Sequence, residues 1–148
     1  MNIFIRKNDD DLLKYLDADE INNIKPFRKI IELNNNDINN DIIFSSGDKG
    51  KDIYLVAEGL LEIFDTNSKG KEIVIVNLYE GEIIGEVNFA ISIKRHFSVR
   101  AKGKTKVICY SYKQLTDLMR KEKIIAAKIN AAINDSMADK TIRITQKL

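Results

Sequence analysis

The first part of the chain has the hydrophobic spacing of two short helices. Residues 8–16 begin with acidic side chains and then place three leucines on one side of a helix. Residues 17–20 (DADE) have the pattern of a capping box, which predicts a second helix that continues through Ile24. Pro26 is expected to end this helix because proline has no backbone N–H to donate. The pattern therefore predicts an N-terminal helical segment over residues 1–26.

From residue 28 onward the apolar period changes to two, which is the period of β-strands. An asparagine-rich loop is expected at 34–40, and glycine and asparagine turns separate the other apolar runs. The predicted strands cover residues 28–33, 41–45, 52–56, 60–64, 71–79 and 104–112. Short strands separated by such turns are typical of a β-sandwich or jelly roll. We therefore expect a jelly-roll barrel over residues 27–112.

The last part of the chain returns to helical spacing, so that residues 113–148 are expected to be C-terminal helices. A first helix is predicted at 112–119 and a longer one from Glu122 onward. In the longer helix apolar residues recur every four positions and alanines surround them. This stripe can pack on the barrel or pair with the same helix of a second copy, and both contacts can coexist. The predicted fold class is mainly β with flanking α.

Composition limits the number of domains and the compartment. With 148 residues, 44% of them hydrophobic, the chain can form one well-buried core, so we expect a single domain over residues 1–148. A formal net charge of +2 does not by itself predict nucleic-acid binding. The single Cys109 lies in an apolar run and is expected to be a small buried hydrophobe, and without a second cysteine no disulfide forms. The absence of a signal peptide and of an apolar run of ~18 residues leads us to expect a cytoplasmic protein without membrane contact.

The candidate chemistry lies in residues 81–101, GEIIGEVNFAISIKRHFSVRA. Gly85 precedes a short predicted helix, where backbone N–H groups can approach an anion closely. Glu86 is a hydrogen-bond acceptor at the start of this helix, and Arg95 is a cationic fork after its end. These residue types around one concavity suit a sugar-phosphate. The alternative reading is structural, because Gly-Glu before a helix is common and an arginine on a strand is usually a surface residue.

This segment resembles the phosphate-binding cassette of the cyclic nucleotide-binding domain family, which includes protein kinase A regulatory subunits and the bacterial catabolite activator protein. The resemblance rests on Ile84-Gly85-Glu86 and on Lys94-Arg95, and the number of residues from Glu86 to Arg95 is that of the kinase branch of the family. The Gly47-Asp48, Tyr54 and Gly59 positions match further landmarks of the family. It implies that Glu86 accepts from a ribose 2′-hydroxyl and that Arg95 pairs with a cyclic phosphate. The backbone amides of Gly85, Glu86 and His96 would complete the cradle. The implied ligand is cyclic AMP or cyclic GMP, with no other cofactor.

The cassette also departs from the family pattern. Ile84 replaces the usual Phe, Lys94 replaces Pro, and His96 and Phe97 stand where small residues are normal. In the family the side chain at the Phe97 position points into the barrel, and overpacking of a tight site costs about 1–3 kcal/mol. The alternative function is therefore a degenerate member that binds no nucleotide and acts as a dimeric protein-interaction module. Phe97, or an internal Glu86–Arg95 ion pair, would then fill the pocket.

The resemblance also concerns the C-terminal helix, whose polar residues reach the nucleotide base in the bacterial regulators. A gapless alignment brings Lys140 and Thr141 to this position. Thr141 is the predicted base contact, and Lys140 is expected on the surface.

Competing chemistries lack the residues they need. A cupin-type metal site needs two or three histidines, and this chain contains only His96, so no metal site is expected. The same shortage of histidine excludes a catalytic triad, and we expect a non-enzymatic protein.

In the bacterial regulators a helix-turn-helix module follows the long helix, whereas this sequence ends at Leu148. We therefore expect no direct DNA binding. The predicted role is a stand-alone regulatory module that senses a cyclic nucleotide and signals through helix rearrangement. The expected partners are a second copy of the chain, through the C-terminal helix, and an effector protein that the sequence does not identify.

Overall fold

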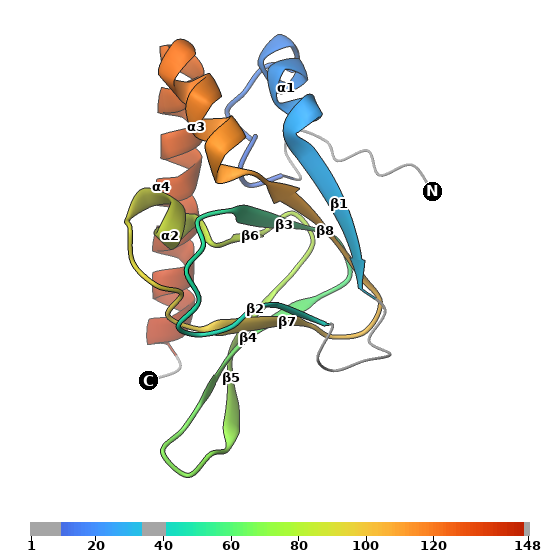
Figure 1. Cartoon of the computed structure of the whole chain (residues 1–148), viewed down its shortest axis with the longest axis vertical. Coiled ribbons are helices and arrows are strands. Elements are labelled where there is room, and N and C mark those ends of the chain that lie inside the picture. Colours follow the sequence, from blue (N-terminus) through green and yellow to red (C-terminus); the bar gives the residue numbers. More distant parts are fainter. Residues whose placement is uncertain (1–9, 34–40, 147–148) are drawn as a thin grey trace.

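The computed structural model of the chain describes residues 10–33 and 41–146. Its strands are β1 (Arg28–Leu33), β2 (Ile42–Phe44), β3 (Ile53–Glu58), β4 (Leu61–Thr66), β5 (Glu72–Leu78), β6 (Ile83–Ile84), β7 (Ser98–Ala101) and β8 (Thr105–Tyr110). They form two four-stranded sheets, in the orders β1-β8-β3-β6 and β2-β7-β4-β5, and every pairing is antiparallel. Figure 1 shows the two sheets one above the other, with the β4–β5 hairpin projecting from the lower one.

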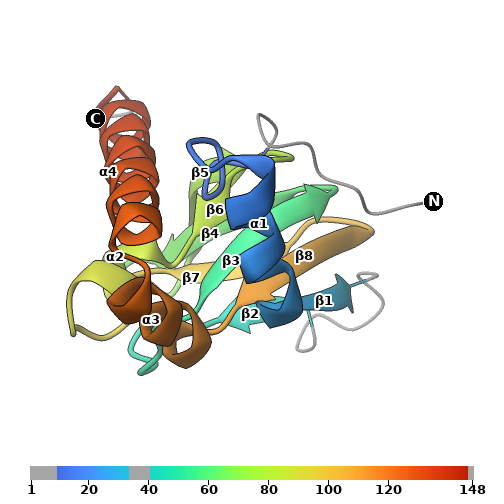
Figure 2. The ribbon, with the colours of Figure 1, turned by 90° about the horizontal axis from the view of Figure 1, so that it is seen from above.

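The helices lie before, within and after the β region. They are α1 (Ala18–Ile24), the 3-10 turn η2 (Lys25–Phe27), α2 (Glu86–Ala90), α3 (Tyr112–Lys121) and α4 (Lys123–Thr145). Figure 2 shows the long α4 standing at one side of the sandwich, with α2 and α3 beside it. The fold class predicted from the sequence is therefore confirmed: a β sandwich with a short N-terminal helix and a long C-terminal helix.

Alternation along the central strands creates two hydrophobic cores. On β3, Ile53 and Leu55 face the helices, whereas Tyr54 and Val56 face the opposite sheet. The helix-side core also contains Leu12, Leu16, Ile24 and Tyr110, together with Leu115, Ile125, Ile129 and Ile133 from α3 and α4. The core between the sheets includes Leu61, Ile63, Val76, Leu78, Val99 and Val107. Because α4 shares the helix-side core, its early turns are fixed to the sandwich.

The N-terminal segment confirms one helix prediction and corrects the other. Asp17 and Glu20 form the predicted capping box of α1, and Pro26 lies within η2 directly after it. The helix predicted over residues 8–16 is wrong for its described part, because residues 11–15 form turns. The Asp10 carboxylate accepts from the amides of Leu12 and Leu13, at 2.8 and 3.2 Å, and this local turn competes with a helix. Asn8 and Asp9, like the loop predicted at 34–40, lie outside the described residues.

The thiol of Cys109 is half-buried rather than fully buried as predicted. Burial raises its pKa to about 11, so it is a poor nucleophile at neutral pH.

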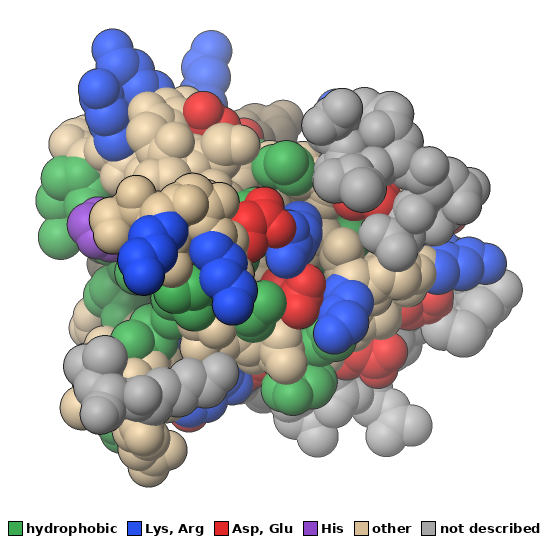
Figure 3. Space-filling model, turned by 90° about the horizontal axis from the view of Figure 1, so that it is seen from below, with side chains coloured by type: hydrophobic (Ala, Val, Ile, Leu, Met, Phe, Trp, Pro, Cys, Tyr) green, Lys and Arg blue, Asp and Glu red, His purple; other side chains and the backbone are tan. Residues whose placement is uncertain are grey.

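Charged groups of both signs are interspersed on the face of the molecule in Figure 3 and do not form a stripe of one sign. Within residues 10–33 and 41–146, every helix is too short or too polar to cross a bilayer.

Candidate functional site

A sharp backbone turn begins the candidate site. The two-residue strand β6 is followed by Gly85, which has a φ of 96° and caps α2 at its N-terminus. A Cβ atom at Gly85 would lie 2.5 Å from the carbonyl oxygen of Asp52 and 2.8 Å from Nη1 of Arg95. Only glycine fits this left-handed conformation and this close approach without displacement. The turn therefore places Glu86, the first residue of α2, inside the fold.

A cavity of about 340 Å³ lies between α2, the sandwich and the last turns of α4. Its walls are largely apolar and include Ile63, Phe97 and Val99 from the sandwich side and Met137, Thr141 and Ile144 from α4. Of the residues that the sequence predicts as ligand-binding, Gly85, Glu86, His96, Phe97 and Thr141 line the cavity. The guanidinium of Arg95 lies outside this lining.

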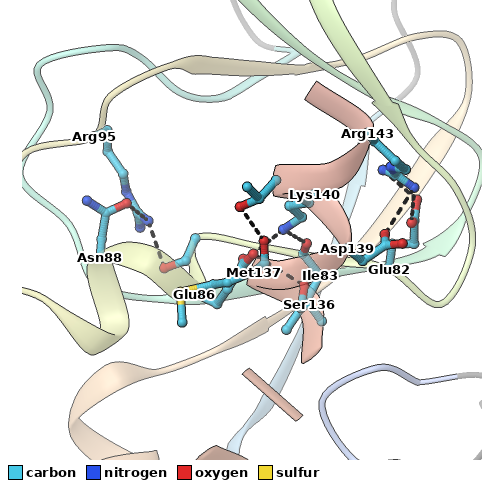
Figure 4. Close-up of polar contacts among 12 residues, drawn as sticks. Glu82, Ile83, Glu86, Asn88, Arg95, Ser136, Met137, Asp139, Lys140 and Arg143 are labelled. Atoms are coloured by element: carbon cyan, nitrogen blue, oxygen red, sulfur yellow. Dashed lines mark hydrogen bonds and ion pairs between the residues drawn. The ribbon is translucent and has the colours of Figure 1, made fainter. Parts of the chain in front are cut away.

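The Glu86 carboxylate is held asymmetrically by α4. Its side chain is buried, with 1% exposure, and Oε1 accepts from Oγ of Ser136 at 3.2 Å. The ammonium group of Lys140 donates to the same oxygen and to the carbonyl oxygen of Ile83 (Figure 4). Within the described part of the chain, Oε2 of Glu86 has no hydrogen-bond partner.

Lys140 is therefore buried, with 8% exposure, and the prediction that it lies on the surface is wrong. The physical reason is that the late turns of α4 approach β6, where Glu86 and the Ile83 carbonyl offer acceptors. Burial lowers the pKa of the Lys140 ammonium, and the charge of Glu86 opposes this effect.

Arg95 is bound to the cassette's own backbone. Its Nη1 donates to Oδ1 of Asn88 at 3.0 Å and to the carbonyl oxygen of Gly85 at 3.4 Å, and its Nη2 donates to the carbonyl oxygen of Asp52 at 3.0 Å. The guanidinium also stacks over the ring of Phe44, 4.1 Å from the centroid. Burial lowers the pKa of Arg95, and its Nε has no partner within residues 10–33 and 41–146.

The sequence predicts that Glu86 and Arg95 face each other around one concavity, but in the structure they do not. In Figure 4, Arg95 lies beside Asn88, whereas the Glu86 side chain points to Lys140 and Ser136 on α4. The described ion pairs assign Glu86 to Lys140, so the internal Glu86–Arg95 pair of the alternative prediction is wrong as well. The carbonyl oxygens of Gly85 and Asp52 and the side-chain oxygen of Asn88 accept from Nη1 and Nη2 of the arginine in place of a carboxylate.

Phe97 forms one wall of the cavity but does not fill it. The ring is half-buried and packs edge-to-face against His96, with centroids 4.9 Å apart. His96 itself is exposed, and its carbonyl oxygen accepts from Oγ of Ser46 at 3.1 Å. The cavity is thus present beside Phe97, contrary to a pocket packed by that ring.

Sequence reasoning missed two polar residues of this site, Asn88 and Ser136, and placed a third, Lys140, on the surface. Asn88 donates to the carbonyl oxygens of Ile93 and Lys94, at 2.9 and 3.1 Å, and thereby closes the loop after α2. Ser136 and Lys140 continue the three- and four-residue spacing of the buried face that contains Ile129 and Ile133. Polar residues that continue a buried helical stripe were the available signal.

The described residues contain no group of three or more His, Cys, Asp or Glu side chains that could hold a metal ion. The polar side chains that line the cavity are those of Glu86, Asn88, His96, Lys140 and Thr141.

The family model for the cyclic nucleotide-binding domain matches residues 39–122, more than half of the chain. The chain belongs to the cyclic nucleotide-binding domain family. Domains of this family are typically non-catalytic and regulatory.

Individual relatives show how the family domain is used elsewhere. The chain is 30% identical over 91 residues to the cyclic AMP receptor protein of Thermus thermophilus, covering 62% of this chain and 42% of that protein. It is 29% identical over 79 residues to a cAMP-dependent protein kinase regulatory subunit of Blastocladiella emersonii, covering 53% of this chain and 20% of that subunit. The match thus spans less than half the length of either relative.

The N-terminal domain of a transcriptional regulator from Streptomyces coelicolor has a similar fold, with a TM-score of 0.75 and 19% identity. The similarity covers 95% of this chain and 93% of that one, so it includes the flanking helices as well as the sandwich.

Proposed function

We propose that this chain is a non-catalytic regulatory module that binds a cyclic nucleotide monophosphate in the cavity between the cassette and α4. The observation that carries the proposal is a pair of buried polar atoms without partners in the described chain. Oε2 of Glu86 is an acceptor and Nε of Arg95 is a donor, and both come from the cassette. Buried polar groups are normally hydrogen-bonded, so two such atoms in one segment favour a ligand with complementary groups.

A cyclic nucleotide supplies those groups. Its ribose hydroxyl can donate to Oε2 of Glu86, and its phosphate oxygens can accept from Nε of Arg95 and from the amides of Gly85, Glu86 and His96. The guanidinium of Arg95 lies outside the cavity lining, and its other nitrogens bind the carbonyl oxygens of Gly85 and Asp52, so contact with the phosphate requires the side chain to move toward the cavity.

The apolar walls suit the flat face of a base, and Thr141 offers a polar contact to its edge. Oγ1 of Thr141 donates to the carbonyl oxygen of Met137 at 2.8 Å, so its lone pairs remain as acceptors. An amino group on the base is the matching donor, and both adenine (at C6) and guanine (at C2) carry one, so this contact fits either nucleotide. We propose cyclic AMP ahead of cyclic GMP because the Thermus and Blastocladiella relatives named above are a cyclic AMP receptor protein and a cAMP-dependent protein kinase regulatory subunit.

Isothermal titration calorimetry with cyclic AMP and cyclic GMP tests the proposal. We expect Arg95→Ala to abolish nucleotide binding, and Arg95→Lys to weaken it strongly because lysine keeps the charge but lacks Nε and the fork. The matched control is Arg100→Ala, since Arg100 also stacks on a phenyl ring at 4.1 Å but pairs with Glu62 and Glu72. Binding of neither nucleotide by the natural chain, or unchanged affinity in a folded Arg95→Ala protein, would reject the proposal.

A second candidate is a dimeric interaction module, which the outer face of α4 favours. This face exposes Ile124, Ala127, Ala131, Ala138 and Ile142, with 69% exposure at Ile124 and 58% at Ile142. Small side chains allow close approach of a second helix, and the proposed partner is the same helix of another copy. Sedimentation should show a dimer that Ala131→Glu converts to a monomer.

The two candidates differ in what Phe97 does. If the phenyl ring blocks nucleotide entry, Phe97→Ala gains affinity for cyclic AMP; if the module already binds, this variant gains little. In either case we propose that the chain acts in the cytoplasm through an effector protein and does not contact DNA itself.

A further inference from the structure

The two oxygens of the Glu86 carboxylate have different surroundings. Both donors from α4, the Ser136 hydroxyl and the Lys140 ammonium, reach Oε1. Oε2 has no partner within the described residues. A lysine that blocked the site would occupy the oxygen that a ligand needs, whereas this lysine leaves that oxygen to the ligand.

The attachment of α4 to the cassette has two points, on either side of β6. Lys140 binds Glu86 and the carbonyl oxygen of Ile83, and Arg143, three residues further on, binds the Glu82 carboxylate. Arg143 also donates to the carbonyl oxygen of Asn77 at 3.1 Å. In Figure 4 both side chains reach from the same helix toward the strand that ends at the cassette. A shift of either the cassette or the helix must therefore disturb these contacts.

We infer that Lys140 is a positioning residue, which fixes one oxygen of Glu86 so that the other is presented to the ligand, and which thereby links α4 to occupancy of the site. The inference rests on the proposed function for the identity of the ligand. The contact itself is independent of any ligand, since the described side chains form it by themselves.

The ion pair between Lys140 and Glu86 is the main contact that links α4 to the cassette. The Lys140 and Glu86 side chains are 10% and 1% exposed, so each charge depends on the other for compensation. Among the described residues, Glu82, Arg143 and Asp11 also interact electrostatically with Lys140, and Arg143 pairs with both Glu82 and Asp139. Removing the ammonium leaves Glu86 a buried carboxylate with only the Ser136 hydroxyl, and it is then free to rotate away from its ligand-binding orientation.

A double-mutant cycle on the full chain tests this inference, with cyclic AMP affinity measured by calorimetry. We expect Lys140→Met to weaken binding by about tenfold or more, the effect of losing one charge-assisted hydrogen bond. In a Glu86→Gln background the same substitution should change affinity by less than about twofold, because its effect acts through Glu86. Lys140→Arg should restore most of the affinity.

Lys128→Met is the matched control. Lys128 lies on the same helix and also forms an ion pair, with Glu20 at 2.6 Å, but it lies outside the cavity lining. Its loss should leave the affinity unchanged.

The same four proteins are also melted without ligand, which separates this inference from the proposed function. Lys140→Met should lower the melting temperature by about 10 °C when Glu86 is present and by only a few degrees when it is Gln. If the natural chain binds no nucleotide but this thermal cycle is non-additive, the proposed function fails and the link between Lys140 and Glu86 stands.

Three results would overturn the inference. Additive effects of the two substitutions would show that Lys140 acts independently of Glu86. Tighter binding by Lys140→Met would show that the lysine blocks the site. Unchanged affinity with a lower melting temperature would show that its role is limited to folding.

Discussion

Two buried carboxylates, Asp10 in the N-terminal segment and Glu86 in the cassette, are held in opposite ways. Asp10 is 2% exposed, and both of its oxygens accept from neutral donors of the chain. The amides of Leu12 and Leu13 bind Oδ1, and the Tyr110 hydroxyl binds Oδ2 at 3.0 Å. Glu86 has a cation and a hydroxyl on one oxygen and no described partner on the other.

The difference separates a carboxylate whose two oxygens are both satisfied by the chain from one that, under the proposed function, binds a ligand. Neutral donors that fill both oxygens anchor the segment but do not compensate the charge, so desolvation raises the pKa of Asp10 to about 6. A cation on a single oxygen compensates the charge and leaves the other oxygen as an acceptor for another molecule. The first arrangement fastens the N-terminal segment to β8; the second is suited to ligand capture.

The two regions are also joined. The amide of Asp11 donates to the carbonyl oxygen of Gly81 at 2.8 Å, at the entrance to β6 and the cassette. A change in the cassette can therefore shift the N-terminal segment through this hydrogen bond. Each of the following predictions changes one of the two regions and uses the other as a reference.

The largest expected effect comes from Gly85→Ala, which disturbs the cassette alone. The new methyl group must adopt a φ of 96° and would lie 2.5 Å from the Asp52 carbonyl oxygen. Left-handed strain and overpacking together should cost about 3–4 kcal/mol, measured by urea unfolding. Nucleotide affinity should fall as well, because the methyl group also displaces Arg95.

Gly47→Ala is the control for backbone strain. Gly47 has a φ of 91°, but a Cβ atom there would meet nothing within 4 Å, so the cost should be about 1 kcal/mol. Equal losses in the two variants would contradict the tight packing described around Gly85.

A smaller effect, limited to the N-terminal region, is expected from the pH dependence of Asp10. Because its folded pKa, about 6, is above the ordinary value of 3.8, the protonated group favours folding below about pH 4. This contribution is lost as the pH rises through about 6. Asp10→Asn keeps an acceptor for the Leu12 and Leu13 amides and stays neutral at every pH. As the pH rises, the unfolding free energy of the natural chain should therefore fall relative to that of the variant.

The gain between about pH 4 and pH 7 should reach about 3 kcal/mol, the free energy of a two-unit pKa difference. It is measured as the difference between the two unfolding curves at each pH, which cancels the other titrating groups. The control is Asp19→Asn, at an exposed position, which should show no such pH-dependent difference from the natural chain. A constant difference across this range would show that Asp10 is not desolvated as described.

The sequence predicts most elements here because their information is local. The strand predicted at residues 28–33 forms β1 with the same bounds, and the 17–20 pattern directly indicates the capping box of α1. Gly85-Glu86 and Arg95 were found because a short segment contains all of them. The helix predicted at 8–16 fails where a single side chain, Asp10, takes the amides that the helix would have used.

What escaped prediction depends on contacts between distant segments. The burial of Lys140 requires that α4 meet β6, 57 residues away in the chain. The orientation of Arg95 requires the Asp52 carbonyl, 43 residues away, and the ring of Phe44. No local pattern reveals either acceptor, although a lysine on an otherwise buried helical face shows that some acceptor is needed.

The smallest expected effect is that of Ser136→Ala, which refines the comparison at Glu86. The hydroxyl is a neutral donor, 3.2 Å from an oxygen that Lys140 also binds. Its removal should cost about 1 kcal/mol of stability and weaken cyclic AMP affinity by about two- to fivefold, which calorimetry can resolve. Ser111→Ala supplies a matched control, because Ser111 caps α3 by accepting from the Gln114 amide at 3.3 Å and its loss should cost about 1 kcal/mol with no change in affinity. If Ser136→Ala weakened binding as much as Lys140→Met, the neutral donor would matter as much as the cation, and the contrast between Asp10 and Glu86 would not rest on charge.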